Sequence, residues 1–149
     1  MARKDVVDSL IATYRELNLQ LRPLGEAKLA AAGPDGSVKD VLKDLRRREI
    51  IASQQLKAML MAEASGDTPA VVDASLIDSG DDLPARVLLS EFGTARESIL
   101  AAASQRSDEE LSRELNVTEG PRSIDALLQS LVESDRVDRE RIKRLLAAS

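Results

Sequence analysis

SIDALLQSLVESDRVDRERIKRLL, residues 123–146, is the stretch that decides the fold. Its apolar residues recur every three or four positions, and this spacing places them on one face of an α-helix. In the middle of that face the pattern turns polar, at Ser134, Asp135 and Asp138. Polar groups on a core-facing stripe cost stability unless they are paired, so they indicate a site or the remains of one. The apolar residues of the stripe are Ile124, Leu127, Leu128, Leu131, Ile142 and Leu145.

Three earlier segments show the same helical spacing. We expect a first helix over about residues 5–21, capped by Asp5, and a long second helix opened by a capping box at Ser37. A third helix is expected from near Asp82, with Pro84 in its first turn, where proline is tolerated. The buried residues expected in the first and third helices are Val7, Leu10, Tyr14, Leu17, Leu21, Leu88, Leu89, Phe92, Ala95, Ile99 and Ala103.

The connections between these helices differ in length. Residues 26–36 form the first, and residues 65–83, rich in Gly, Asp, Ser and Pro, form the longest irregular stretch. Antiparallel neighbours need fewer residues than that, so the stretch indicates a crossover connection between the second and third helices. A short extra helix is expected from the cap at Ser107 to about Leu115, before the last helix. The chain is therefore predicted to be one all-α domain, residues 1–149, folded as a four-helix bundle.

Composition excludes several classes of function. The chain has 149 residues, a formal net charge of −5 and neither Cys nor His. The missing Cys excludes a disulfide framework, and the missing His excludes a Ser-His triad and the commonest ligand of zinc. There is no basic stripe to neutralise phosphates and no apolar run of ~18 residues, so we expect neither nucleic acid nor a membrane as partner. The N-terminus lacks the apolar core of a signal peptide, so a cytoplasmic location is expected.

The second helix carries a polar break much like that of the last helix. Its apolar stripe is interrupted by Arg48 and Glu49, and Asp44 lies one turn before Arg48, beside the same face. Two helices of the predicted bundle therefore each carry polar side chains within an apolar face. The apolar residues of the second stripe are Val38, Val41, Leu45, Ala52, Leu56 and Met59.

Two motifs in these helices resemble the DinB-like superfamily, the damage-inducible-type four-helix bundles that include the N-terminal domain of mycothiol-dependent maleylpyruvate isomerases. GSVKDVLKDL at residues 36–45, with Glu49 following, is similar to the family's second-helix signature. SDRVDRERI at residues 134–142 is similar to the family's His-Asp-x-x-His run followed by Gln-Ile. The short helix and the Gly-Pro break before the last helix also match the family's order.

The resemblance implies a metal site whose ligands have been replaced. In the family, one histidine of the second helix and two of the fourth bind a divalent metal, which supports hydrolase and thiol-transfer activities. The positions that match these histidines are Asp44, Ser134 and Asp138. With all three histidines replaced, we expect no resident metal.

Three interpretations of Asp44, Ser134 and Asp138 are open. In the first, arginines on the same two helices pair with the carboxylates, and an ion-pair network ties the second helix to the fourth. In the second, the same residues, with Glu49, hold a hard cation such as magnesium, manganese or calcium, which oxygen ligands suit. In the third, the mouth of the bundle is a metal-free pocket for a small molecule, with these groups as polar anchors.

The sequence thus predicts a metal-independent DinB-like protein that binds a small molecule or a partner, and the resemblance implies a homodimer. The alternative is an enzyme, a hydrolase or thiol S-transferase that uses a hard divalent cation. No residue is singled out as catalytic. The residues expected at the binding site are Asp44, Ser134 and Asp138 and, in support of them, Arg48, Glu49 and Arg141.

Overall fold

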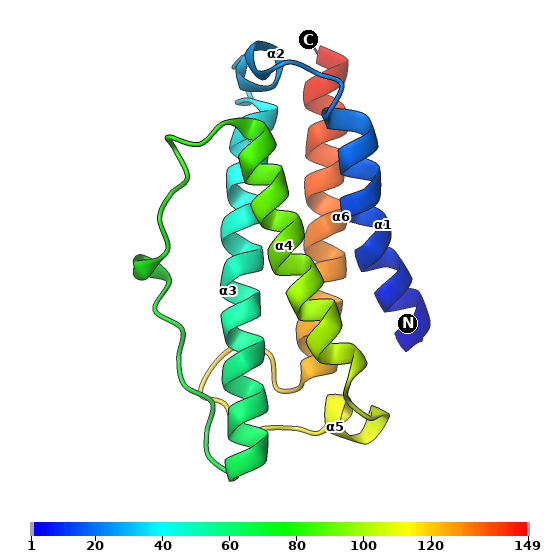
Figure 1. Ribbon diagram of the computed structural model, residues 1–149, viewed down its shortest axis with the longest axis vertical. Helices are drawn as coiled ribbons and strands as arrows, with labels where there is room; N and C mark the ends of the chain where they lie inside the picture. The colour runs from blue at the N-terminus through cyan, green and yellow to red at the C-terminus, as the bar shows by residue number, and fades with distance from the viewer. Residues whose placement is uncertain (1, 149) are drawn as a thin grey trace.

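The computed structural model describes residues 2–148 and shows four long helices packed side by side (Figure 1). They are α1 (Arg3–Leu21), α3 (Val38–Ser65), α4 (Ala85–Ser104) and α6 (Ile124–Ala148). Three short helices lie in the connections: α2 (Glu26–Ala30), the 3-10 helix η1 (Ala74–Leu76) and α5 (Asp108–Ser112). Residues 2–148 contain no strand, so the prediction of an all-α four-helix fold is confirmed. None of the helices in this part of the chain is long and apolar enough to cross a membrane.

Side chains that satisfy free backbone groups set several helix ends. The Ser37 hydroxyl accepts a hydrogen bond from the Asp40 amide at 3.1 Å, and the Asp40 carboxylate accepts one from the Ser37 amide at 3.0 Å. The same reciprocal box, from Ser107 and Glu110, opens α5. Gly66 ends α3 with φ of +79°, a left-handed conformation that glycine adopts without steric cost. Both predicted capping boxes are therefore present.

Three predicted helix ends were wrong by a few residues, and one short helix was not predicted. Ala2 rather than Asp5 precedes α1, so Asp5 lies in the first turn, where the helix dipole still favours a negative charge. Pro84 precedes α4 instead of lying within it. Helix α5 ends at Ser112, before Leu115. The connection over residues 26–36 contains α2, which is too short to show a helical repeat in sequence.

The buried face of α1 is rotated slightly from the predicted one. Val6 and Thr13 are buried, whereas Val7 and Tyr14 are only half-buried. Tyr14 lies against α4, where its ring occupies the space that a Cβ atom on Gly93 would need. The tyrosine ring also meets the Phe92 ring edge to face, with centroids 6.0 Å apart. Close approach of α1 to α4 at this glycine therefore places Tyr14 at the edge of the core.

The core consists of two apolar halves with a polar layer between them. One half gathers residues such as Leu10, Leu56 and Ile99, and the other gathers residues such as Leu17 and Leu45. The nearest residues of the two halves lie seven positions apart on α1, α3 and α4, and eleven positions apart on α6. On α3, α4 and α6 this interval carries the buried polar residues Glu49, Arg96, Asp135 and Asp138.

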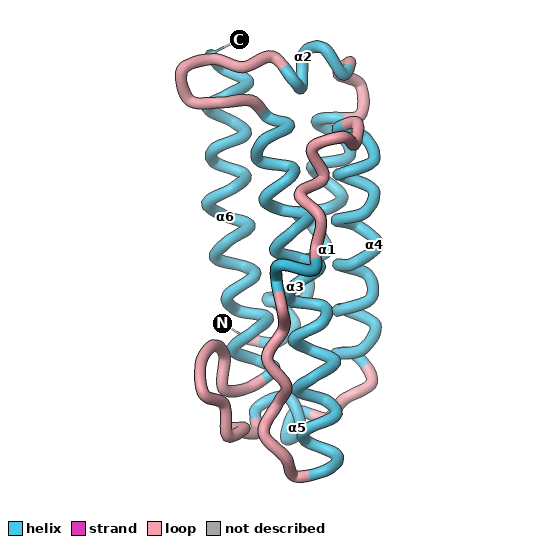
Figure 2. Tube along the Cα trace, turned by 90° about the vertical axis from the view of Figure 1, so that its left-hand side faces the viewer, coloured by secondary structure: helices cyan, strands magenta, loops and turns pink. Residues whose placement is uncertain are grey.

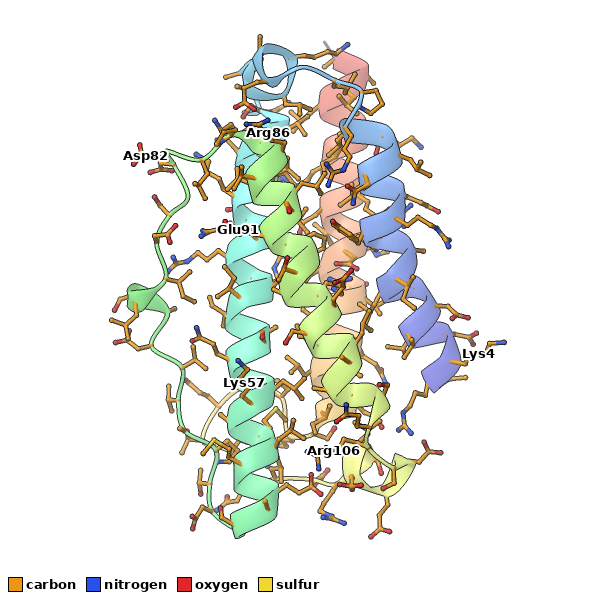
Figure 3. The ribbon with its side chains drawn as sticks, in the orientation of Figure 1. Lys4, Lys57, Asp82, Arg86, Glu91 and Arg106 are labelled. Atoms are coloured by element: carbon orange, nitrogen blue, oxygen red, sulfur yellow. The ribbon has the colours of Figure 1, made fainter. Side chains whose placement is uncertain are left out.

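The crossover strap, residues 66–84, runs along the outside of α3 (Figure 2). Arg47 fastens it by donating hydrogen bonds to the carbonyl oxygens of Ile77 at 2.7 Å and Ala74 at 2.6 Å. Arg46, which is buried, donates to the Asp78 carbonyl at 3.1 Å. Arg46 also pairs with Glu91 of α4, labelled in Figure 3, at 3.1 Å. Guanidinium groups, more than apolar packing, therefore hold the strap to the bundle.

Candidate functional site

A buried arginine, Arg96 of α4, lies at the centre of the polar layer. Its guanidinium group donates to Glu49 of α3 through Nε and, at 3.0 Å, through Nη2. It donates to both carboxylate oxygens of Asp135 of α6, each at 2.8 Å. Its fifth N–H donates to the Leu10 carbonyl of α1 at 2.9 Å. All five donors of the guanidinium group are satisfied, and all four long helices meet at this Arg96 centre.

Burial makes the Arg96 centre electrostatically distinct from the ion pairs of the surface. Arg96 is 1% exposed, and its guanidinium carbon lies 4.9 Å from the centre of the Phe92 ring. Burial alone lowers the pKa of Arg96, but hydrogen bonds to Asp135 and Glu49 outweigh it and raise that pKa. Burial raises the pKa of Glu49, and the Arg96 hydrogen bonds offset this only in part. Burial is the main reason why the pKa of Glu49 is raised, and the neighbouring charge of Asp135 adds to it.

A second, outer set of ion pairs contains two of the three positions that match the family's histidines. Arg48 of α3 donates to Asp138 of α6, and Arg141 lies 3.8 Å from the other oxygen of Asp138. The same Arg141 nitrogen reaches Asp44 of α3 at 3.4 Å. Asp138 is buried, but the side chain of Asp44 is 57% exposed. This Asp138 network therefore joins α3 to α6 and opens to solvent at the Asp44 end.

The third matched position, Ser134, stays outside both sets of ion pairs. Ser134 is half-buried on α6, one turn before Asp138. Asp44 and Asp138 are linked through Arg141, which pairs with both. A cavity of about 510 Å³ between α1 and α6 is lined in part by Asp135, but not by any of the three matched positions. The structure thus brings Asp44 and Asp138 to one network and leaves Ser134 beside it.

The matched positions do not fit the metal centre that the resemblance implies. Both oxygens of Asp138 face guanidinium groups, and Asp44 lies at the outer end of Arg141. Glu49, expected in support, is turned to Arg96 in the bundle centre. Within the described chain no group of three acidic residues is placed to hold a metal ion. A cation here would have to displace Arg48 and Arg141 from a carboxylate that they already neutralise.

Sequence reasoning missed Arg96, the residue with the most contacts to charged partners in the core. The predicted stripe of the third helix passed through Ala95, which is half-buried, and omitted Arg96. The spacing of Phe92, Arg96 and Ile99 is that of a single helix face, so the signal was present. Unpaired acids in the apolar stripes of two other helices were the second signal, because buried carboxylates need a cationic partner.

Charged side chains lie both on the surface of the bundle and in its core. Figure 3 labels Lys4 and Lys57, which are exposed on the outside of the bundle. By contrast, Arg96, Glu49 and Asp135 are buried at its centre. Among the residues that the structure describes, the buried charged side chains are those of the polar layer and Arg46, which holds the strap.

The chain matches no protein-family model, no curated protein and no solved structure. It is an all-helical, compact protein with four long helices. Any kinship with the DinB-like superfamily is accordingly inferred from the two motifs and from the order of the helices.

Proposed function

We propose that the chain is a DinB-like four-helix bundle that works without a bound metal, as a binding protein for a small molecule or a partner protein. The order of the elements supports this: a second helix with a capping box, a crossover connection, and a short helix before the last long one. The two motifs that resemble the family lie on α3 and α6, the helices that carry the family's metal ligands. A homodimer and a cytoplasmic location belong to the same proposal.

One observation carries the metal-independent part of the proposal. Asp138, the only fully buried member of the three matched positions, is paired with both Arg48 and Arg141. Two guanidinium groups at one carboxylate supply the positive charge that a divalent ion would supply in the family. In this proposal the arginines take over the structural task of the metal, which is to hold the second helix against the fourth.

The test is metal binding by protein purified without a His tag. We expect no stoichiometric metal by elemental analysis, and no change of Tm on adding magnesium, manganese, calcium or EDTA. Because a ligand that binds only the folded state raises Tm, stoichiometric binding would be visible in the melt. Metal bound at one per chain, with a Tm shift that Asp138→Ala abolishes and Glu140→Ala keeps, would contradict the proposal. It would favour the metal-dependent hydrolase or thiol transferase instead.

The oligomeric state is tested separately by sedimentation velocity. We expect a dimer at micromolar concentration. A monomer at all concentrations would remove the homodimer from the proposal without touching its metal-independent part.

A further inference from the structure

We propose that a pocket between α3, the crossover strap and the loop over residues 117–121 binds a small, mainly apolar molecule that carries one cationic group. This inference goes beyond the proposed function, because it names a site away from the matched positions and the class of ligand that the site takes. It rests on the proposal of a binding protein only in that it gives such a protein a ligand site.

Three segments far apart in sequence form the pocket, which has a volume of about 280 Å³. Helix α3 contributes Ile51, Gln55 and Met59, the strap contributes residues 69–72, and the loop contributes residues 117–121. Small-molecule sites typically measure about 300–1,000 Å³, so this pocket lies just below that range and takes only a small molecule.

The walls of the pocket are mostly apolar, with a single ionisable group. Ile51, Met59, Val71, Val72 and Val117 contribute apolar side chains to its lining. Glu119 is the only charged side chain among the lining residues, and Gln55 adds an amide. Apolar walls with a few placed polar groups are typical of ligand sites, and a lone carboxylate favours a cation over an anion.

Hydrogen bonds outside the pocket fasten both the strap and the loop. Arg47 holds the strap just beyond Val72, through the carbonyls of Ala74 and Ile77. The Leu115 amide donates to the Arg122 carbonyl at 2.7 Å and closes the loop that carries Glu119. Walls held in place before a ligand arrives reduce the ordering cost of binding. The pocket is therefore preorganised rather than formed only by contact with a ligand.

An exposed valine on the strap shows that the apolar wall is not part of the core. Val71 lines the pocket, yet 71% of it is exposed. Leu76 lies on the same strap and is 82% exposed, but it does not line the pocket. Because both side chains contribute little to the core, they form a matched pair for testing the site without unfolding the protein.

The experiment titrates three probes of similar size and different charge: 2-phenylethylammonium, 2-phenylethanol and phenylacetate. Binding is followed by amide shifts in ¹H–¹⁵N NMR spectra of the full chain. We expect shifts confined to the pocket segments and the affinity order cation, alcohol, anion. Glu119→Gln should remove the cation's advantage over the alcohol, roughly two- to threefold for an exposed carboxylate, and leave the alcohol's affinity unchanged.

The matched pair then tests the apolar wall. Val71→Asn should weaken all three probes about fivefold, because an apolar contact with the ring is lost, whereas Leu76→Asn should leave them unchanged. Unchanged Tm values for both variants show that the fold is kept. Shifts outside the pocket segments, preference for phenylacetate, or equal effects of the two substitutions would overturn the inference. Each of those results is independent of the metal titration, so the proposed function would stand or fall separately.

Discussion

The Arg96 centre and the Asp138 network use the same chemistry less than one turn apart along α6, but they differ in exposure. In the first, one guanidinium group serves two carboxylates and a backbone carbonyl in the core. In the second, one buried carboxylate is shared by Arg48 and Arg141, whose side chains are each 34% exposed. Removing Arg96 leaves two carboxylates in the core without their cation. Removing Asp138 instead leaves two arginines that can turn into solvent.

The largest effect is expected from Arg96→Met. The substitution leaves Glu49 and Asp135 buried without their cation, and breaking a buried pair on one side costs about 3–5 kcal/mol. Urea unfolding followed by circular dichroism measures the loss, and Arg136→Met on the exposed face of α6 is the control.

A triple substitution sharpens that test. Replacing the whole group, Arg96→Met with Glu49→Leu and Asp135→Leu, should recover most of the lost stability, because a buried ion group exchanged for apolar side chains is often neutral. A triple variant less stable than Arg96→Met alone would show that the centre stabilises the fold through more than mutual neutralisation.

A smaller loss is expected from Asp138→Ala, about 1–3 kcal/mol. Arg48 and Arg141 lose their shared acceptor, but both guanidinium groups can turn into solvent. The same unfolding experiment measures the loss. Ser134→Ala, one turn away and outside the ion pairs, should stay within about 0.5 kcal/mol. Equal losses for Asp138→Ala and Arg96→Met would abolish the distinction between the outer and inner sets.

The pH dependence of Glu49→Gln comes next in size. The pKa of Glu49 is raised above its ordinary 4.5 by burial, so the folded state takes up a proton more readily than the unfolded state. The stability from this group is full below the ordinary pKa and is lost as the pH rises through the raised pKa. As the pH falls toward 4.5, the stability of the wild type should therefore rise relative to that of the Gln variant, as measured by urea unfolding at each pH.

Glu133→Gln provides the opposite sign as a control. The hydrogen bond from Arg136 lowers the pKa of this exposed carboxyl, so its contribution is lost as the pH falls through the lowered pKa. The advantage of wild type over Glu133→Gln should shrink in acid, while its advantage over Glu49→Gln grows. Two curves of the same sign would contradict the assignment for Glu49.

The smallest effect belongs to Asp44→Ala, at the solvent end of the outer network. Its 3.4 Å contact with Arg141 is exposed, and such pairs contribute about 0–1 kcal/mol. The change in unfolding free energy should vanish at high salt, because salt screens exposed charges. A salt-independent loss would place Asp44 in a drier setting than its exposure indicates.

Most of the fold follows from local sequence signals. The capping boxes at Ser37 and Ser107 and the apolar stripes predict the long helices, because both depend on residues a few positions apart. Helix α2 was missed since five residues carry no full repeat. The crossover connection was predicted from the length of residues 65–83, but its ties through Arg46 and Arg47 were not.

The candidate site was predicted only in part. Glu49, Asp135 and Asp138 were visible as polar residues in apolar stripes, and pairing between the second and fourth helices was one of three open interpretations. Arg96 was missed because the stripe of α4 was drawn one residue away. Which arginine meets which acid depends on how the helices rotate and approach, and no single helix encodes that.

The bare backbone of Gly93 fixes how α1 slides along α4. Tyr14 fits into the gap that the missing side chain leaves, and one turn further on Arg96 reaches the Leu10 carbonyl. A shift of one residue would move α1 by about 1.5 Å along its axis. That shift would move the Tyr14 ring away from Gly93 and would also break the hydrogen bond from Arg96 to the Leu10 carbonyl. The missing side chain of Gly93 thus fixes the register in which α1 and α4 pack.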